Sequence, residues 1–77
     1  MKVKVLLFGI LSEKAKASDI AFENVSDLNA LLARIRVEYP EIKNMQHLVS
    51  INREVVKENK ILNDGDEIAL LPPFAGG

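Results

Sequence analysis

Residues 62–73 read "LNDGDEIALLPP", which is a turn, a short apolar strand and a stop in direct succession. Gly65 supplies the positive φ that a tight turn requires. In a strand, alternate side chains face opposite sides, here Ile68 and Leu70 on one side and Glu67, Ala69 and Leu71 on the other. Pro72 and Pro73 have no backbone N–H for a sheet. The stretch therefore predicts a final strand that ends at the prolines.

Three further segments have the alternation of strands. Residues 2–8 place one apolar row (Val3, Val5, Leu7) opposite a second face that carries Leu6 and Phe8. A short strand around residues 20–22 follows and is expected to return antiparallel to the first. Residues 49–51 and 54–56 are predicted to form a hairpin through a tight turn at Asn52-Arg53.

The pattern changes to a helical period after Ser26. Ser26 is expected to cap a helix, with Asp27 favoured at the positive end of its dipole. An apolar stripe follows at steps of three and four residues: Leu28, Leu31, Leu32, Ile35 and Tyr39. Pro40 ends the helix, because the residue before a proline is pushed out of helical geometry.

The predicted order is strand, strand, helix, strand, strand, strand, with at most one helical turn in the connection at 12–16. A single main helix can cover one face of a mixed five-stranded sheet. This α+β order is that of the ubiquitin-like β-grasp, in which, by analogy with the fold, the first and last strands lie parallel at the centre. We therefore expect a β-grasp domain over 1–71 and an extended tail over 72–77.

Composition excludes several classes of protein. The 77 residues carry 10 Lys and Arg against 11 Asp and Glu, with no basic run for nucleic acid. No apolar stretch approaches the length of a membrane span, so the cytoplasm is the expected location. There is no Cys, and His47 has no second ligand at metal spacing, so neither a metal site nor a nucleophile is expected. Asp64, Asp66 and Glu67 are too close together for a calcium loop and are expected to form a solvated turn.

The last residues, "PPFAGG", suggest a chemical use. Gly76 and Gly77 carry no side chains, so this arm is thin enough to enter another protein's active site, with Gly77 offering its terminal carboxylate. The two prolines direct the arm away from the sheet. A free carboxylate needs activation, for example as an acyl-adenylate, and the chain has no phosphate-binding Gly-rich loop. Other proteins would therefore perform the chemistry.

The segments "KVKVLLFG" and "LNDGDEIALLPPFAGG" resemble the small, sulfur-carrying subunits of molybdopterin synthase, and the similarity covers essentially the whole chain. The resemblance implies that an ATP-dependent activating enzyme adenylates Gly77 and that a sulfur donor converts it to a thiocarboxylate. The tail would then enter the large synthase subunit, within a heterotetramer, and give its sulfur to a cyclic pterin precursor. The small subunit itself would bind neither cofactor nor metal.

The strand pattern also predicts a docking surface. If the first and last strands are neighbours, Leu6 and Phe8 meet Ala69 and Leu71 on the face opposite the helix, and exposed apolar patches of this kind mark interfaces. Val55 extends the patch. The resemblance implies that Phe8, Val55 and Leu71 contact the partner enzymes. Phe74 and Ala75 are expected to touch the partner as well.

Three alternatives stay open at this point. A related carrier of thiamine biosynthesis also ends in Gly-Gly, although it usually lacks the two prolines. A ubiquitin-like protein modifier would pass the same acyl-adenylate to a lysine of a target protein. A plain interaction domain would have an inert tail.

Overall fold

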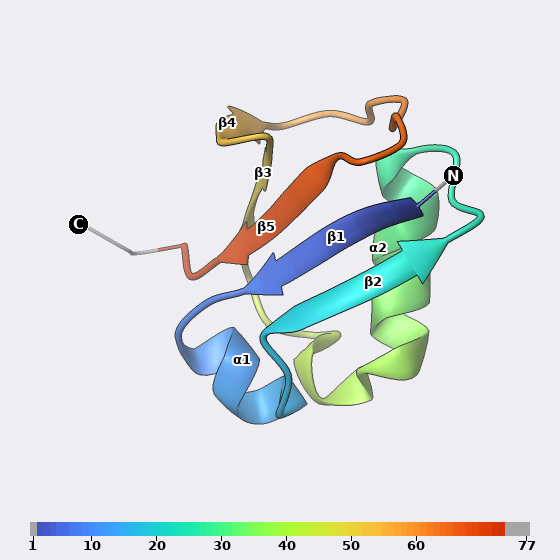
Figure 1. Cartoon of the computed structure of the whole chain (residues 1–77). Coiled ribbons are helices and arrows are strands. Elements are labelled where there is room, and N and C mark those ends of the chain that lie inside the picture. The colour runs from blue at the N-terminus through green and yellow to red at the C-terminus, as the bar shows by residue number, and fades with distance from the viewer. Residues whose placement is uncertain (1, 74–77) are drawn as a thin grey trace.

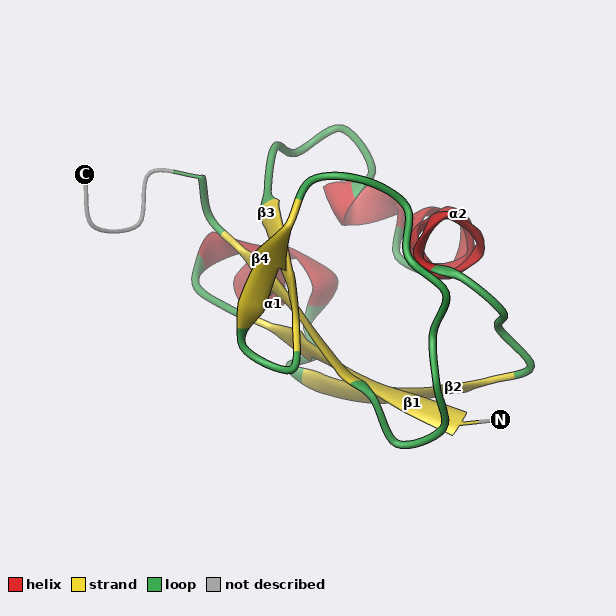
Figure 2. Ribbon diagram, turned by 90° about the horizontal axis from the view of Figure 1, so that it is seen from above, coloured by secondary structure: helices red, strands yellow, loops and turns green. Residues whose placement is uncertain are grey.

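The computed structural model describes residues 2–73 and shows a mixed sheet with its main helix on one face (Figures 1 and 2). The elements follow in the order β1 (Lys2–Leu7), α1 (Ile10–Ala15), β2 (Asp19–Glu23), α2 (Leu28–Glu38), a 3-10 turn η1 (Pro40–Ile42), β3 (Leu48–Ile51), β4 (Glu54–Val56) and β5 (Glu67–Leu71). The five strands lie in the order β2-β1-β5-β3-β4. The predicted ubiquitin-like β-grasp is confirmed.

The parallel pairing of β1 with β5 is also confirmed. Val5 pairs with Ile68 and Leu6 with Ala69, so the two strands run side by side through the middle of the sheet. β2 pairs antiparallel with β1, and β3 pairs antiparallel with β5. Pairing in this register places the inward rows of both central strands on the same face.

The hairpin between β3 and β4 has the turn that its sequence predicts. Asn52 and Arg53 both have positive φ, at 50° and 73°. Positive φ at both central residues is the geometry of a type I′ turn, which matches the twist of the strands that it joins. The turn is held by Asn52, whose side chain accepts from the Glu67 N–H and donates to Asp66.

The cap of α2 differs from the prediction by one residue. Asp27, not Ser26, caps the helix, and its carboxylate accepts from the Ala30 N–H at 2.8 Å. This hydrogen bond, and a second from the Asn59 side chain, hold the pKa of Asp27 below its ordinary value. The backbone carbonyl of Ser26 instead accepts from the Leu62 N–H. A long-range backbone pairing decided between two good capping residues, which local sequence does not reveal.

The connection between β1 and β2 is a six-residue helix, α1, which begins earlier than the helical turn expected at 12–16. Leu11 in its first turn is fully buried. α1 is therefore part of the core and not only a link, because Leu11 closes one end of the space beneath the sheet.

The core lies between the sheet and α2. Its sheet side is supplied by Val3, Val5, Leu7, Ile68 and Leu70, and α2 contributes Leu28, Leu31 and Ile35, with Leu32 and Tyr39 at the margin. These are the two stripes that the alternation and the helical period predict. Within residues 2–73, no helix is long and apolar enough to cross a membrane.

Candidate docking and carrier site

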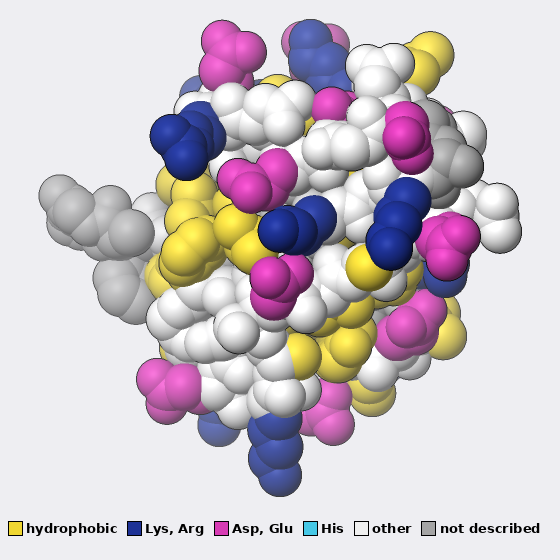
Figure 3. Space-filling view, in the orientation of Figure 1, with side chains coloured by type: hydrophobic (Ala, Val, Ile, Leu, Met, Phe, Trp, Pro, Cys, Tyr) yellow, Lys and Arg dark blue, Asp and Glu magenta, His cyan; other side chains and the backbone are white. Residues whose placement is uncertain are grey.

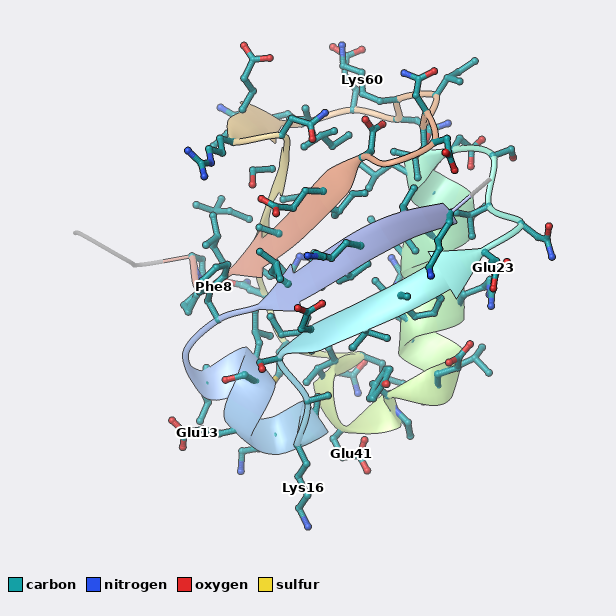
Figure 4. All side chains as sticks on the ribbon, in the orientation of Figure 1. Phe8, Glu13, Lys16, Glu23, Glu41 and Lys60 are labelled. Carbon is teal, nitrogen blue, oxygen red and sulfur yellow. The ribbon has the colours of Figure 1, made fainter. Side chains whose placement is uncertain are left out.

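The candidate site lies at one end of the two central strands. β1 and β5 are parallel, so their C-terminal ends meet at the same edge of the sheet. β5 ends at Leu71, and the chain continues through Pro72 and Pro73. Figure 4 shows Phe8 just beyond the end of β1 and beside the end of β5. The root of the tail and the end of the first strand are therefore neighbours.

The structure brings all five predicted patch residues together. Leu6, Phe8, Val55, Ala69 and Leu71 line one hollow on the face of the sheet opposite α2. In Figure 3 one group of hydrophobic side chains lies over the ends of β1 and β5, at the left of the view. We call these five residues the outer patch. Its geometry agrees with the strand pattern, and its role as an interface stays a prediction.

The residues of the outer patch differ in exposure, with a small buried residue at the centre of the hollow and larger exposed residues around it. Ala69 is 9% exposed and pairs across the sheet with Leu6 on one side and Ser50 on the other. Phe8 and Val55 stand higher, at 43% and 56% exposed. A small residue between larger ones leaves a depression, which suits a protruding apolar side chain of a partner.

Three polar residues at the hollow are absent from the prediction. Ser50, Arg53 and Glu67 line it together with the apolar residues. Ser50 is directly opposite Val55 in the β3–β4 hairpin, so the hairpin register could have indicated it. Alternation along β5 already places Glu67 on the side of Ala69 and Leu71, whereas the direction of Arg53 depends on the positive-φ turn. An apolar centre with a polar rim is the common anatomy of a protein interface.

The proposed tail is only partly within the described structure. Pro72 is half-buried and Pro73 is exposed, and both follow directly on β5. Phe74, Ala75, Gly76 and Gly77, including the predicted reactive carboxylate, lie outside the described residues. Among residues 2–73, no group of three or more His, Asp or Glu side chains is arranged to hold a metal ion.

His47 lies in the loop before β3 and is half-buried. Burial lowers the pKa of His47, and the nearby positive charge of Arg36 lowers it further. Its Nδ1 is buried and has no hydrogen-bond partner in the part of the chain that the structure describes. His47 is not among the residues that line the hollow of the outer patch, although its chain neighbour Leu48 pairs with Leu71.

Known proteins resemble this chain from end to end. A "Molybdopterin synthase sulfur carrier subunit" from Chlamydomonas reinhardtii is 32% identical over the whole of both chains. A solved "protein-protein complex of subunit 1 and 2 of Molybdopterin-converting factor" from Helicobacter pylori contains a chain that is 31% identical, with full coverage of both chains and a TM-score of 0.78.

A solution structure of the "small archaeal modifier protein 1" from Methanosarcina acetivorans is also similar, with 25% identity and a TM-score of 0.83 over 99% of this chain and 96% of that one. The sequence of residues 5–77 matches the ThiS family. This match includes all five residues of the outer patch, the prolines and the Gly-Gly pair, and the chain therefore belongs to the ThiS family.

Proposed function

We propose that the protein is the sulfur carrier subunit of a molybdopterin synthase, with Gly77 as the residue that bears the sulfur. The observation that carries the proposal is the end-to-end similarity to a sulfur carrier subunit, at 32% identity. The geometry is in keeping with it, because an apolar hollow adjoins the point where the chain leaves β5.

The chemistry begins at the carboxylate of Gly77. Attack on ATP forms a mixed anhydride with AMP and releases pyrophosphate. A sulfide-level donor then attacks the acyl carbon, displaces AMP and leaves a thiocarboxylate. When this sulfur passes to a cyclic pterin precursor, Gly77 returns to a carboxylate, with the oxygen supplied by water. ATP belongs to the activating enzyme, and this chain is a non-catalytic subunit, because it has no Cys and no phosphate-binding Gly-rich loop.

The outer patch would dock the large synthase subunit, in a heterotetramer, and the activating enzyme in turn. The relative from Helicobacter pylori was solved as a complex of subunits 1 and 2. Docking at the patch would bring the root of the tail to the partner's surface, since Phe8 and Leu71 adjoin Pro72. Tethering a reacting group in this way replaces a bimolecular encounter by a local one.

The test is to incubate the protein with an activating enzyme, ATP and a sulfur donor, and to record the intact mass. We expect the oxygen-to-sulfur mass difference at Gly77, and sulfur transfer to the pterin precursor when the large subunit is added. A variant lacking Gly77 and a variant with one residue appended serve as controls and should gain no sulfur. A wild-type protein whose mass never changes would overturn the proposal.

A second candidate is a protein modifier, favoured by the likeness to the modifier protein from Methanosarcina acetivorans. It uses the same activated Gly77 but transfers the acyl group to a lysine. Isopeptide-linked conjugates that disappear in the variant lacking Gly77 would support it. Thiocarboxylate without any conjugate would leave the sulfur carrier as the main function, and transfer to an acceptor other than the pterin precursor would indicate a thiamine-type carrier.

A further inference from the structure

The turn between β1 and α1 lies against the ring of Pro72, the first residue after β5. Gly9 has φ 58° and ψ −134°, and the Leu11 N–H donates to the Phe8 carbonyl at 3.2 Å across it. These dihedrals belong to the first central position of a type II′ turn, which glycine dominates. A Cβ on residue 9 would lie 2.9 Å from Cγ of Pro72. Pro72 therefore packs in the space where a side chain would otherwise be.

We call the turn at Phe8 and Gly9, against which Pro72 packs, the seat of Pro72. Hydrogen bonds and a buried side chain hold this seat in place. The Phe8 N–H donates to the Leu70 carbonyl at 3.2 Å, which ties the turn to the end of β5. The Ser12 hydroxyl donates to the Gly9 carbonyl at 2.8 Å. Leu11, two residues further on, is fully buried in the core. The turn has little freedom to move away from an added methyl group.

Pro72 has little freedom either. Its Cγ belongs to a ring that closes on the backbone nitrogen, so a change of ring pucker is the only side-chain adjustment and a larger shift moves the backbone. Gly77 is five residues beyond Pro72. Five extended residues span at most about 18 Å. A tilt of about 10° at Pro72 would move the far end of such a stretch by about 3 Å.

We propose that Gly9 is a positioning residue for sulfur transfer. Its missing side chain lets Pro72 seat on the β1–α1 turn, and this seat sets the direction in which the chain leaves the sheet toward the partner's active site. The inference rests on the proposed function, because it concerns the aim of the same tail. Gly9 touches none of the reacting atoms and acts through Pro72 alone.

The experiment compares Gly9→Ala with Gly65→Ala. Gly65 also has positive φ, at 87°, but a Cβ there would meet nothing within 4 Å. Both variants carry backbone strain, and only Gly9→Ala displaces Pro72. With thiocarboxylated protein and saturating large subunit, we expect single-turnover sulfur transfer to slow by about 10–100-fold in Gly9→Ala, since small misplacements of a reacting group have effects of this size. The dissociation constant for the large subunit should change by less than about threefold in either variant.

The seat itself is tested by repeating Gly9→Ala in a Pro72→Ala background, which lacks the ring. If the contact is responsible, the added methyl group should then slow transfer by less than about twofold. If Gly9→Ala does not fold, Pro72→Ala carries the test with Gly65→Ala again as the control, and only Pro72→Ala should slow transfer.

Four results would overturn the inference alone: wild-type rates in Gly9→Ala, equal slowing in Gly9→Ala and Gly65→Ala, the full effect of Gly9→Ala without the ring, or wild-type rates in Pro72→Ala. A wild-type protein that never accepts sulfur would overturn the proposed function instead.

Discussion

The two faces of the central strands are built from similar apolar residues but differ in how far water reaches them. On the inner face, Val5, Ile68 and Leu70 are at most 1% exposed beneath α2. On the outer face, Phe8 is 43% exposed and its neighbours Leu6 and Leu71 are only half-buried. Because α2 packs on the opposite side of the sheet, the inner row is covered and the outer row faces outward (Figures 2 and 3).

The difference separates folding from docking. Burial of the inner row removes apolar area from water at every moment that the protein is folded, and this stabilises the domain. The outer row keeps its apolar area in water until a partner covers it. The free energy gained by burying this area therefore contributes to association and not to folding. Neighbouring residues on one strand therefore contribute to different equilibria, one to folding and the other to binding.

The strongest test of the comparison is a truncation on the inner face. Ile68→Ala removes a side chain that is 0% exposed and leaves a cavity beneath the sheet. We expect the free energy of unfolding to fall by about 2–5 kcal/mol. The matched change on the same strand, Leu71→Ala, should cost about 1 kcal/mol, because that side chain is only half-buried. Urea denaturation measures both.

A domain of this size has only about 3–5 kcal/mol of stability from its core, so Ile68→Ala could be unfolded throughout the titration. Ile68→Val keeps the comparison measurable, with an expected loss of about 0.5–1.5 kcal/mol. Equal losses in Leu71→Ala and Ile68→Ala would show that the outer patch is part of the folding core.

The reverse test is a truncation on the outer face. Phe8→Ala should weaken binding to a large synthase subunit by about 1–2 kcal/mol, or roughly 5–30-fold, as for an aromatic anchor of an interface. Its cost in unfolding free energy should stay below about 1 kcal/mol. Calorimetric titration and urea denaturation give the two quantities.

Val37→Ala is the control for Phe8→Ala. Val37 is 80% exposed on α2, and α2 lies on the opposite side of the sheet from the outer patch. Its truncation should change neither quantity. If Val37→Ala and Phe8→Ala weaken binding to the same extent, the outer patch is not where the partner docks.

Both rows are readable from the sequence, because alternation with period two assigns each residue to a face and a β-grasp order makes β1 and β5 neighbours. The contact of Gly9 with Pro72 cannot be predicted from the sequence, because the two residues are far apart in the chain. It also depends on a turn with positive φ at Gly9. The sequence predicts Ser26 as the cap of α2, whereas Asp27 is the cap. The reason is similar, because the long-range hydrogen bond between Ser26 and Leu62 fixes where α2 begins. Local pattern thus predicts the faces of the strands and the turn at Asn52-Arg53, whereas long-range contacts decide where α2 begins and how Gly9 meets Pro72.

His47 lies at the margin of the core, where the inner face of the sheet is no longer fully covered by α2. It lines a hollow between α2 and the β3–β4 hairpin, next to Leu32 and Leu48. The charged residues Lys57 and Glu58 line the same hollow, and Arg36 near the end of α2 acts on the imidazole. Burial and Arg36 both disfavour the charged imidazole, so the pKa of His47 is lower in the folded protein than the ordinary 6.5.

The smallest predicted effect is therefore a loss of stability on mild acidification. As the pH falls below 6.5, the unfolded chain takes up a proton on His47 before the folded protein does. Because the unfolded state then binds more protons, stability decreases from that pH down to the folded pKa of His47. The Asp27 carboxylate, whose pKa lies below its ordinary 3.8, loses its stabilising cap only at lower pH, so the two effects occupy separate windows. Urea midpoints between about pH 7.5 and about pH 5.5 should fall in the wild type and stay nearly flat in His47→Gln, which cannot titrate. If the urea midpoint of His47→Gln falls with pH as steeply as that of the wild type, another group links protonation to folding. The margin of the core at His47 is then not the pH-sensitive part of the fold.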